Sequence, residues 1–405
     1  MKELFEEYYN EAEEILSKMS LEQKVGQLFF SRFNNKTQDS DITKKFVGGY
    51  VLFGVDFDDS EDNIIKNLEY IQKLSQKTMN VPLGLSVDEE GGTVTRISYY
   101  KFHRNERFPS PHDIYEKSGL EGLLEIEKEK RDLLRKFKMN VNLAPVADFT
   151  NNISDYIYER TLGYPLNETI EYISKEVNAY NEDNFTCCTK HFPGYGNNKN
   201  THDQIAIDER PYDTFEKEDL KPFIAGIEQN IPMILVSHNI VKCKDDEYPA
   251  SISKIWHDIL RNDLKYSGLI LTDDLSMDAI KLYSGDYSPA IIAINAGNDI
   301  LLTSQFDEHL SAAIDAVKNG TISVETINRA CKRIIAWKLK YIGKIPIEDG
   351  GDGGKKNTTL FICLIIAGII VLGVIIYFLL KCCVFNKNKT RVTITESLTP
   401  LEISE

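Results

Sequence analysis

The chain alternates short runs of apolar residues with longer segments in which apolar residues recur every three or four positions. The short runs are typical of buried β-strands, and the longer segments are typical of helices that bury one face. Eight runs predict strands at residues 25–30, 49–53, 83–87, 141–146, 187–189, 233–237, 269–272 and 300–303. Eight amphipathic segments predict helices at residues 1–18, 64–76, 120–136, 170–181, 215–228, 253–264, 309–318 and 324–339.

Strands that alternate with helices over about 300 residues indicate an α/β fold in which helices connect parallel strands. Eight such units favour a TIM-like (β/α)8 barrel, and a doubly wound open sheet is the alternative. Polar residues follow most of the runs, namely Asp88, Asp148, Lys190, His238 and Asp273. An open sheet binds ligands at one switch point, whereas a barrel brings all strand ends to one mouth. We therefore predict a barrel with a single catalytic domain over residues 1–344.

The composition changes after this domain. Residues 345–359 form a Gly-rich acidic stretch that predicts a linker. Residues 360–380 contain no charge, and as a helix rising about 1.5 Å per residue they would span roughly 30 Å, the thickness of a bilayer core. A buried core helix is the alternative, but the short tail at 381–405, basic and then acidic, offers nothing to cover it. We therefore predict a single transmembrane helix at 360–380.

The orientation of this helix follows from the charges around it. Four basic residues closely follow the helix and two closely precede it, so the positive-inside rule favours a cytosolic tail and a catalytic domain on the extracellular or lumenal side. No apolar core follows Lys2, so a signal peptide is not expected. A tail-anchored protein with a cytosolic catalytic domain is the alternative.

The charge and the cysteine content of the chain bear on whether it binds nucleic acid, a metal or another cofactor. The 405 residues include 47 Lys and Arg against 62 Asp and Glu, a formal charge of −15. No basic excess is present to neutralise phosphates, so nucleic acid is not an expected partner. The seven cysteines form no Cys-x-x-Cys pair, and no metal site or other cofactor is predicted.

One segment combines reactive side chains with a sharp turn. Lys190 and His191 end an apolar run, Phe192-Pro193-Gly194-Tyr195-Gly196 follows, and His202 lies shortly behind. Pro and Gly turn the backbone at the end of a strand, so we interpret this segment as an active-site loop. On composition alone, ordinary polar residues at a strand end are an equal alternative.

Six sequence blocks, in the same order, resemble the β-N-acetylglucosaminidase branch of glycoside hydrolase family 3. They are residues 21–29, Val87-Asp88-Glu89-Glu90-Gly91-Gly92, residues 142–148, Arg160-Thr161-Leu162-Gly163, the Lys190 to Gly196 run with its following His, and Thr272-Asp273-Asp274-Leu275-Ser276-Met277. The resemblance covers roughly residues 15–340. It implies a metal-independent and cofactor-independent exo-acting hydrolase that removes terminal β-linked N-acetylglucosamine from a glycan.

The resemblance also implies residue roles. Retaining glycosidases need a nucleophile at the anomeric carbon and a group that protonates the leaving oxygen; here these are Asp273 and His202. An imidazole titrates near pH ~6.5, so it can give and take a proton near neutrality. The implied sugar-binding residues are Asp88, Arg160, Lys190 and His191. From the residues alone, Arg160 could instead form a structural ion pair and Asp274 could cap a helix.

Two positions depart from the family pattern. Asn200 stands where the family has Asp beside the catalytic His, and an amide cannot stabilise an imidazolium as a carboxylate does. Thr93 stands where the family has Arg. Without that Asp, a catalytically weakened carbohydrate-binding surface protein is an alternative. Because a His acid/base carries no negative charge that would repel phosphate, an N-acetylglucosaminide phosphorylase of the same fold is another alternative, and a β-glucosidase of the same fold is a third.

Overall fold

The computed structural model describes residues 3–198, 206–277, 280, 283 and 287–347. The chain divides into two compact units, Met1–Pro346 and Ile347–Glu405, and only the first is described here. Within the described ranges no helix has both the length and the apolar character needed to cross a bilayer. The predicted transmembrane segment at 360–380 and His202 both lie outside the described residues.

Eight parallel strands form the centre of the first unit. They are β1 (Phe29–Arg32), β2 (Gly49–Leu52), β3 (Gly84–Val87), β4 (Val141–Asn142), β5 (Thr186–Phe192), β7 (Met233–Val236), β9 (Leu269–Thr272) and β10 (Leu301–Thr303). Their order in the sheet is β10-β1-β2-β3-β4-β5-β7-β9, and a parallel bridge from Leu271 to Ile300 joins the last strand to the first. The sheet therefore closes on itself, and the (β/α)8 barrel is confirmed.

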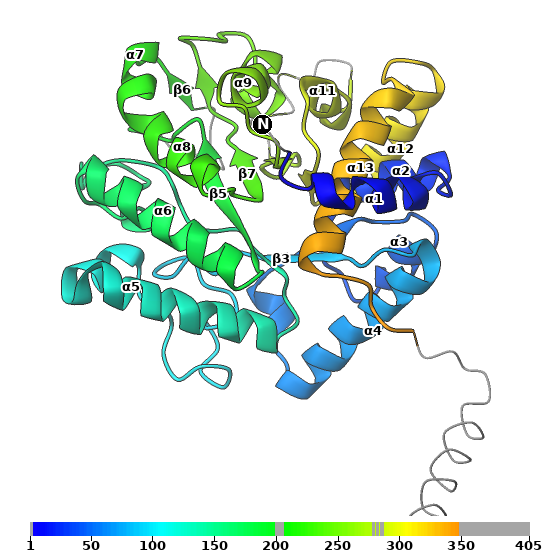
Figure 1. The fold of residues 1–405 in the computed structure, drawn as a ribbon, viewed down its shortest axis with the longest axis horizontal. Helices are drawn as coiled ribbons and strands as arrows, with labels where there is room; N and C mark the ends of the chain where they lie inside the picture. The colour runs from blue at the N-terminus through cyan, green and yellow to red at the C-terminus, as the bar shows by residue number, and fades with distance from the viewer. Residues whose placement is uncertain (1–2, 199–205, 278–279, 281–282, 284–286, 348–405) are drawn as a thin grey trace, which may run out of the picture. The chain divides into compact units, whose positions relative to one another are not determined.

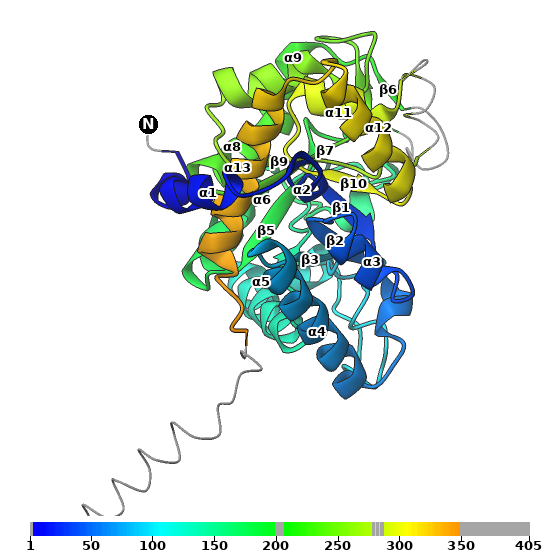
Figure 2. The same ribbon diagram turned by 90° about the vertical axis from the view of Figure 1, so that its right-hand side faces the viewer.

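Helices surround the strands (Figure 1). They are α1 (Tyr9–Leu16), α2 (Leu21–Gln27), α3 (Gln38–Thr43), α4 (Glu61–Met79), α5 (Pro111–Lys136), α6 (Leu166–Glu182), α7 (Tyr212–Thr214), α8 (Leu220–Glu228), α9 (Lys254–Asp258), α11 (Pro289–Ala296), α12 (Phe306–Lys318) and α13 (Val324–Tyr341). π-helical turns at Phe215–Asp219 and Ile259–Asp263 complete the predicted helices 215–228 and 253–264. Helix α1 packs on α13 (Figures 1 and 2), so the first and last helices close the barrel wall together.

The predicted strand at 25–30 is wrong in its first half. Val25 and Gln27 belong to α2, and the strand begins only at Phe29. Ser20 accepts a hydrogen bond from the Gln23 N–H, and the Gln23 side chain accepts one from the Ser20 N–H. This capping box starts the helix, and Val25 supplies its buried face rather than a strand residue.

Other strands begin or end at residues different from those predicted, because the pattern within one segment does not determine how that segment pairs with a neighbouring strand. The predicted strand at 141–146 pairs regularly only at Val141–Asn142, whereas the run at 187–189 extends to Thr186–Phe192. Helix α11 was not predicted because it is apolar on nearly all sides and has no helical period. A short sheet outside the barrel, β6 (Ile207–Asp208) with β8 (Ile240–Val241), was also missed.

The end of the barrel opposite the carboxyl ends of the strands is closed by polar contacts inside an apolar core. The Lys338 amine donates hydrogen bonds of 2.7 Å to Gln27 Oε1 and to the Gly48 carbonyl. Its side chain is fully buried, and this burial lowers the pKa of Lys338 to about 7. Nearby, Trp337 Nε1 donates to Thr186 Oγ1 at 3.0 Å, which attaches α13 to β5.

Candidate active site

A cavity of about 500 Å³ lies at the carboxyl ends of the strands. Five of the six predicted site residues line it. Asp88 follows β3, Arg160 lies between β4 and β5, Lys190 and His191 belong to β5, and Asp273 follows β9. Parallel strands end at one face of a barrel, which explains why residues so far apart in sequence meet here. The sixth, His202, lies outside the described residues.

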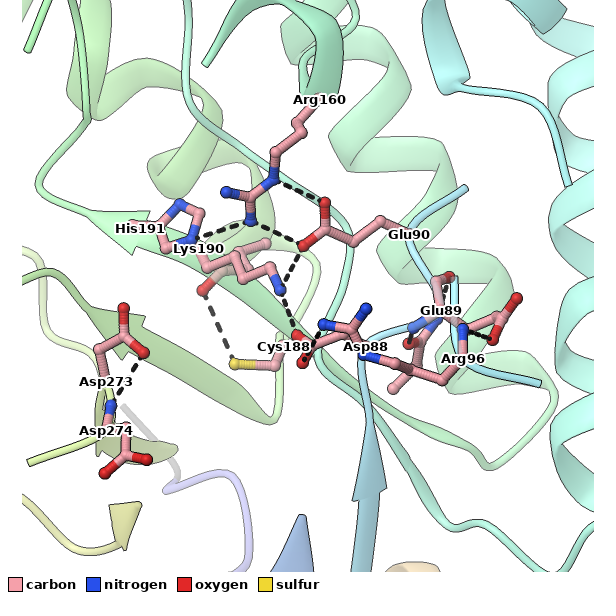
Figure 3. Close-up of polar contacts among 12 residues, drawn as sticks. Asp88, Glu89, Glu90, Arg96, Arg160, Cys188, Lys190, His191, Asp273 and Asp274 are labelled. Atoms are coloured by element: carbon pink, nitrogen blue, oxygen red, sulfur yellow. Dashed lines mark hydrogen bonds and ion pairs between the residues drawn. The ribbon is translucent and has the colours of Figure 1, made fainter. Parts of the chain in front are cut away.

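Four charged side chains form one network on a wall of this cavity (Figure 3). Lys190 Nζ lies 2.6 Å from Asp88 Oδ1 and 2.6 Å from Glu90 Oε1. Arg160 donates from Nε and Nη2 to the two Glu90 oxygens at 2.9 and 2.8 Å. Glu90 therefore joins both cations, and its carboxylate is held by a two-pronged guanidinium contact.

Burial by itself would raise the pKa of Glu90, but the charges of Arg160 and Lys190 outweigh it and hold that pKa well below its usual range. Burial would likewise lower the pKa of Lys190, and the Asp88 and Glu90 carboxylates raise it instead. Glu90 and Lys190 are consequently both charged at neutral pH. Such fixed charges can form strong hydrogen bonds with the hydroxyls of a sugar.

The orientation of His191 is fixed by Asp148, which is fully buried. Asp148 Oδ2 accepts the His191 backbone N–H at 3.1 Å and lies 2.7 Å from Nδ1. The other oxygen accepts the Tyr195 N–H at 2.7 Å. With Nδ1 directed at the carboxylate, Nε2 faces Arg160 Nη2 at 3.3 Å and accepts from it. Asp148 thus supports the site by orienting His191.

The turn after β5 requires glycine. Gly194 has a φ of +128°, and a Cβ there would lie 2.6 Å from the Asp219 Cβ. Asp219 and Asp208 both bind the guanidinium of Arg210, at 3.0 and 2.8 Å. Asp208 also accepts from the Asn198 amide at 2.7 Å. This ion-pair network fixes both ends of the segment that contains the undescribed residues 199–205.

The two adjacent aspartates after β9 have different surroundings. The Asp273 N–H donates to the Val236 carbonyl at 3.2 Å, and Asp273 lines the cavity across from the charged network (Figure 3). Asp274 Oδ1 accepts from the N–H groups of Ser276 and Ser304 at 2.8 and 3.1 Å, and Oδ2 accepts from Ser304 Oγ at 2.5 Å. Asp274 is therefore a structural residue that ties the turn after β9 to the turn after β10.

Two expectations from the sequence need comment. Arg160 forms the ion pair that was weighed as an alternative to sugar binding, but its side chain also lines the cavity. His238 was expected near the site because it follows a strand. It is fully buried, with Nδ1 2.7 Å from Ser251 Oγ and Nε2 3.0 Å from the Asp274 carbonyl oxygen, and it is not among the residues that line the cavity.

Sequence reasoning missed the central residue of the network, Glu90. A carboxylate two positions after Asp88 at a strand end was the available signal. It also missed Arg96, whose guanidinium lies 3.8 Å from Asp88 and 5.5 Å from the ring centre of Phe53. Among the described residues, no group of three or more His, Cys, Asp or Glu side chains could hold a metal ion.

Residues 20–337 match the Glycosyl hydrolase family 3 N terminal domain. The chain belongs to this family. The resemblance seen in the six sequence blocks is confirmed, and the matched range contains the whole barrel apart from α1 and the end of α13.

The names of similar proteins agree with this assignment. A "Beta-hexosaminidase" of Idiomarina loihiensis is 29% identical over 297 residues, which cover 70% of this chain and 84% of that protein. An "Uncharacterized secreted glycosyl hydrolase" of Arthroderma benhamiae is 27% identical over 309 residues, which cover 73% and 85%.

Two solved structures have a similar fold. A family 3 β-N-acetylglucosaminidase from Paenibacillus sp. superposes with a TM-score of 0.75 at 26% identity, covering 83% of this chain and 65% of that one. A β-N-acetylhexosaminidase from Beutenbergia cavernae gives a TM-score of 0.70 at 25% identity, with 79% and 99% covered.

Proposed function

We propose that this chain is an exo-acting glycoside hydrolase that removes terminal β-linked N-acetylglucosamine with retention of configuration. The observation that carries the proposal is that Asp273 and the network of Lys190, Asp88, Glu90 and Arg160 line one cavity at the barrel mouth. The two relatives named as β-N-acetylglucosaminidase and β-hexosaminidase support the choice of sugar.

In the proposed reaction, a carboxylate oxygen of Asp273 attacks the anomeric carbon while the glycosidic bond to the leaving oxygen breaks. An acid donates a proton to that oxygen, and the remainder of the glycan departs. The same group then removes a proton from water, which attacks the anomeric carbon and releases Asp273 and the free sugar. We assign the acid/base role to His202, on the motif alone.

The sugar-binding assignments follow the charges on the wall of the cavity. We assign Asp88 and Lys190 to the ring hydroxyls, because the carboxyl oxygen of one, an acceptor, and the amine of the other, a donor, lie 2.6 Å apart and can both contact adjacent hydroxyls. Arg160 and His191 are assigned to the same sugar from the neighbouring wall. Hydrogen bonds of this kind accelerate the reaction if they tighten in the transition state.

The deciding experiment treats the full-length chain in detergent with p-nitrophenyl β-N-acetylglucosaminide, with and without phosphate. Release of N-acetylglucosamine at the same rate in both buffers is the expected result. Formation of the sugar 1-phosphate would make the protein a phosphorylase. Binding without release would make it a carbohydrate-binding protein, and faster release of glucose from the matching glucoside would make it a β-glucosidase.

We also propose that residues 360–380 anchor the enzyme in a membrane with the barrel on the extracellular or lumenal side, on the length and apolar character of that segment. Deleting 360–380 should move the protein from the membrane fraction to the soluble fraction with activity retained. Protease added to sealed cells should degrade the barrel of the full chain; protection of the barrel would reverse the orientation.

A further inference from the structure

A second and wider cavity adjoins the catalytic one. Its volume is about 1080 Å³, roughly twice that of the catalytic cavity, and we call it the acidic groove. It is formed by the segments that follow β1, β2 and β10, at the same end of the barrel. Arg32 and Ser304 line both cavities, so the two meet at these side chains.

The junction between the cavities is held by hydrogen bonds. Arg32 donates to both oxygens of Asp56 at 2.5 and 3.2 Å, and its guanidinium lies 4.6 Å from the ring centre of Phe53. Ser304 is bound by Asp274, which directly follows Asp273 in the chain. A glycan whose terminal sugar reaches Asp273 therefore has a preformed opening beside it for the next residues.

The lining of the acidic groove suits a polar ligand that is not anionic. Six side-chain amides line it, and amides both donate to and accept from hydroxyls. Two cations, Arg32 and Lys45, face six carboxylates, which leaves a net charge of −4. The carboxylates are Asp41, Asp56, Asp58, Asp59, Asp307 and Glu308.

Three of these carboxylates have no cationic partner. Arg32 binds Asp56, and Lys45 lies between Asp41 and Asp307. In the described part of the chain, Asp58, Asp59 and Glu308 form no ion pair, and all three are exposed. The Asn63 amide and the Ser60 N–H lower the pKa of Asp59. The unpaired charge is therefore available to a ligand.

Acidic residues also favour helix N-termini, which provides a structural reason for some of this charge. Helices α3, α4 and α12 begin at the groove, and each helix end contributes about half a positive elementary charge. Together they offset about 1.5 of the four negative charges. The acidic groove thus stays negative after this compensation.

We propose that the acidic groove binds the part of the glycan beyond the cleaved bond and selects a glucosamine residue with a free, protonated amine there. This inference rests on the proposed function, because it places the departing part of the substrate. An ammonium group forms charge-assisted hydrogen bonds with carboxylates, whereas an acidic sugar would be repelled. The substrate class is a partly de-N-acetylated chitooligosaccharide.

The test compares three substrates on the full-length chain at about pH 6: N-acetylglucosaminyl-β-1,4-glucosamine, N,N′-diacetylchitobiose and the p-nitrophenyl glycoside. We expect kcat/KM to be roughly tenfold higher for the glucosamine disaccharide than for diacetylchitobiose at low salt, and to differ by about twofold at most in 0.5 M salt, because exposed charges are screened. Equal values at low salt would overturn the inference while the hydrolase assignment stands.

A set of variants locates the effect. Asp58→Asn, Asp59→Asn and Glu308→Gln combined should abolish the preference and leave kcat/KM for the aryl glycoside unchanged. The matched control is Glu116→Gln, Glu121→Gln and Glu125→Gln on α5, which makes the same change in net charge at three exposed positions. A preference lost equally in the control would overturn the inference. If the chain cleaves none of the three substrates, the proposed function fails and this inference fails with it.

Discussion

At the scale of single residues, the site depends on pairs whose two members have different tasks. Asp273 and Asp274 both line the cavity, but the Asp274 carboxylate accepts hydrogen bonds from Ser276 and Ser304. Asp88 and Glu90 both line the cavity, but Glu90 is nearly fully buried and lies between two cations. Replacing Asp273 or Asp88 should therefore affect catalysis. Replacing Asp274 or Glu90 should affect the stability of the structure.

Asp273→Asn should reduce turnover of the aryl glycoside by roughly a thousandfold or more and leave sugar binding intact, because an amide is a poor nucleophile of nearly the same shape. Asp274→Asn is the matched control, with an expected loss of about tenfold at most, since its carboxylate is engaged by Ser276 and Ser304. Steady-state kinetics and calorimetric binding of N-acetylglucosamine measure both. Activity of Asp273→Asn within tenfold of the parent would remove this residue from the nucleophile role.

Glu90→Gln should lower the free energy of unfolding by about 3–5 kcal/mol, because it leaves Lys190 and Arg160 buried with one carboxylate fewer. Glu129→Gln removes an exposed partner of Arg104 and should cost less than about 1 kcal/mol. Denaturant unfolding of both variants measures the difference.

The same variant has a pH signature. The folded pKa of Glu90 lies below its unfolded value, so its contribution is present above about pH 4.3 and is lost as pH falls below that value. The gap between parent and Glu90→Gln should therefore narrow in acid. A gap that widens there would contradict the charge assignment.

At the scale of elements, the turn after β5 is tightly constrained by its neighbours. Gly194 has a positive φ and lies against Asp219, which in turn binds Arg210. The β6–β8 sheet, which no local pattern predicted, continues from the same network through Asp208. The described residues on either side of 199–205 are thus held by elements outside the barrel.

Gly194→Ala should destabilise the protein by about 2 kcal/mol or more, because the new Cβ meets both an unfavourable φ and the Asp219 side chain. It should also lower kcat. Gly54→Ala is the matched control, because a Cβ there meets no atom within 4 Å and its φ is ordinary. Thermal unfolding and aryl glycoside kinetics test the pair, and equal effects at the two glycines would disprove the constraint at Gly194.

At the scale of the whole molecule, the closed barrel buries a lysine at the end opposite the site. The folded pKa of Lys338 is about 7, below its unfolded value near 10.4. Between these values the unfolded chain binds more protons than the folded chain, so this residue makes stability rise with pH, by up to about 1.4 kcal/mol per pH unit. A neutral amine still has two N–H groups for its two acceptors.

Lys338→Met should remove this dependence. Urea unfolding from about pH 7 to 9 measures the free energy of unfolding of parent and variant. As pH rises, the free energy of unfolding of the parent should increase relative to that of the variant. Taking the difference between two proteins cancels the titration of the buried cysteines and tyrosines. A difference independent of pH would mean that Lys338 remains charged in the folded protein.

The sequence by itself determined the number and order of the barrel strands and most of the site. Strand and helix periods are local, and the carboxyl ends of parallel strands must share one face. The positions of Asp88, Lys190 and Asp273 at strand ends were therefore enough to predict that these residues lie close together. At Val25 the apolar run and the helix-capping signal conflicted, and a strand was predicted where the structure has a helix. Helix α11 has no helical period of apolar residues, so it was missed.

Only the tertiary structure decided which charges pair and what surrounds the site. Glu90 binds Arg160 from 70 positions away, and Lys190 binds Asp88 from 102 positions away. The acidic groove exists because closure of the barrel places β10 beside β1. Such contacts depend on register and closure, which join distant segments, and no periodic pattern within one segment encodes them.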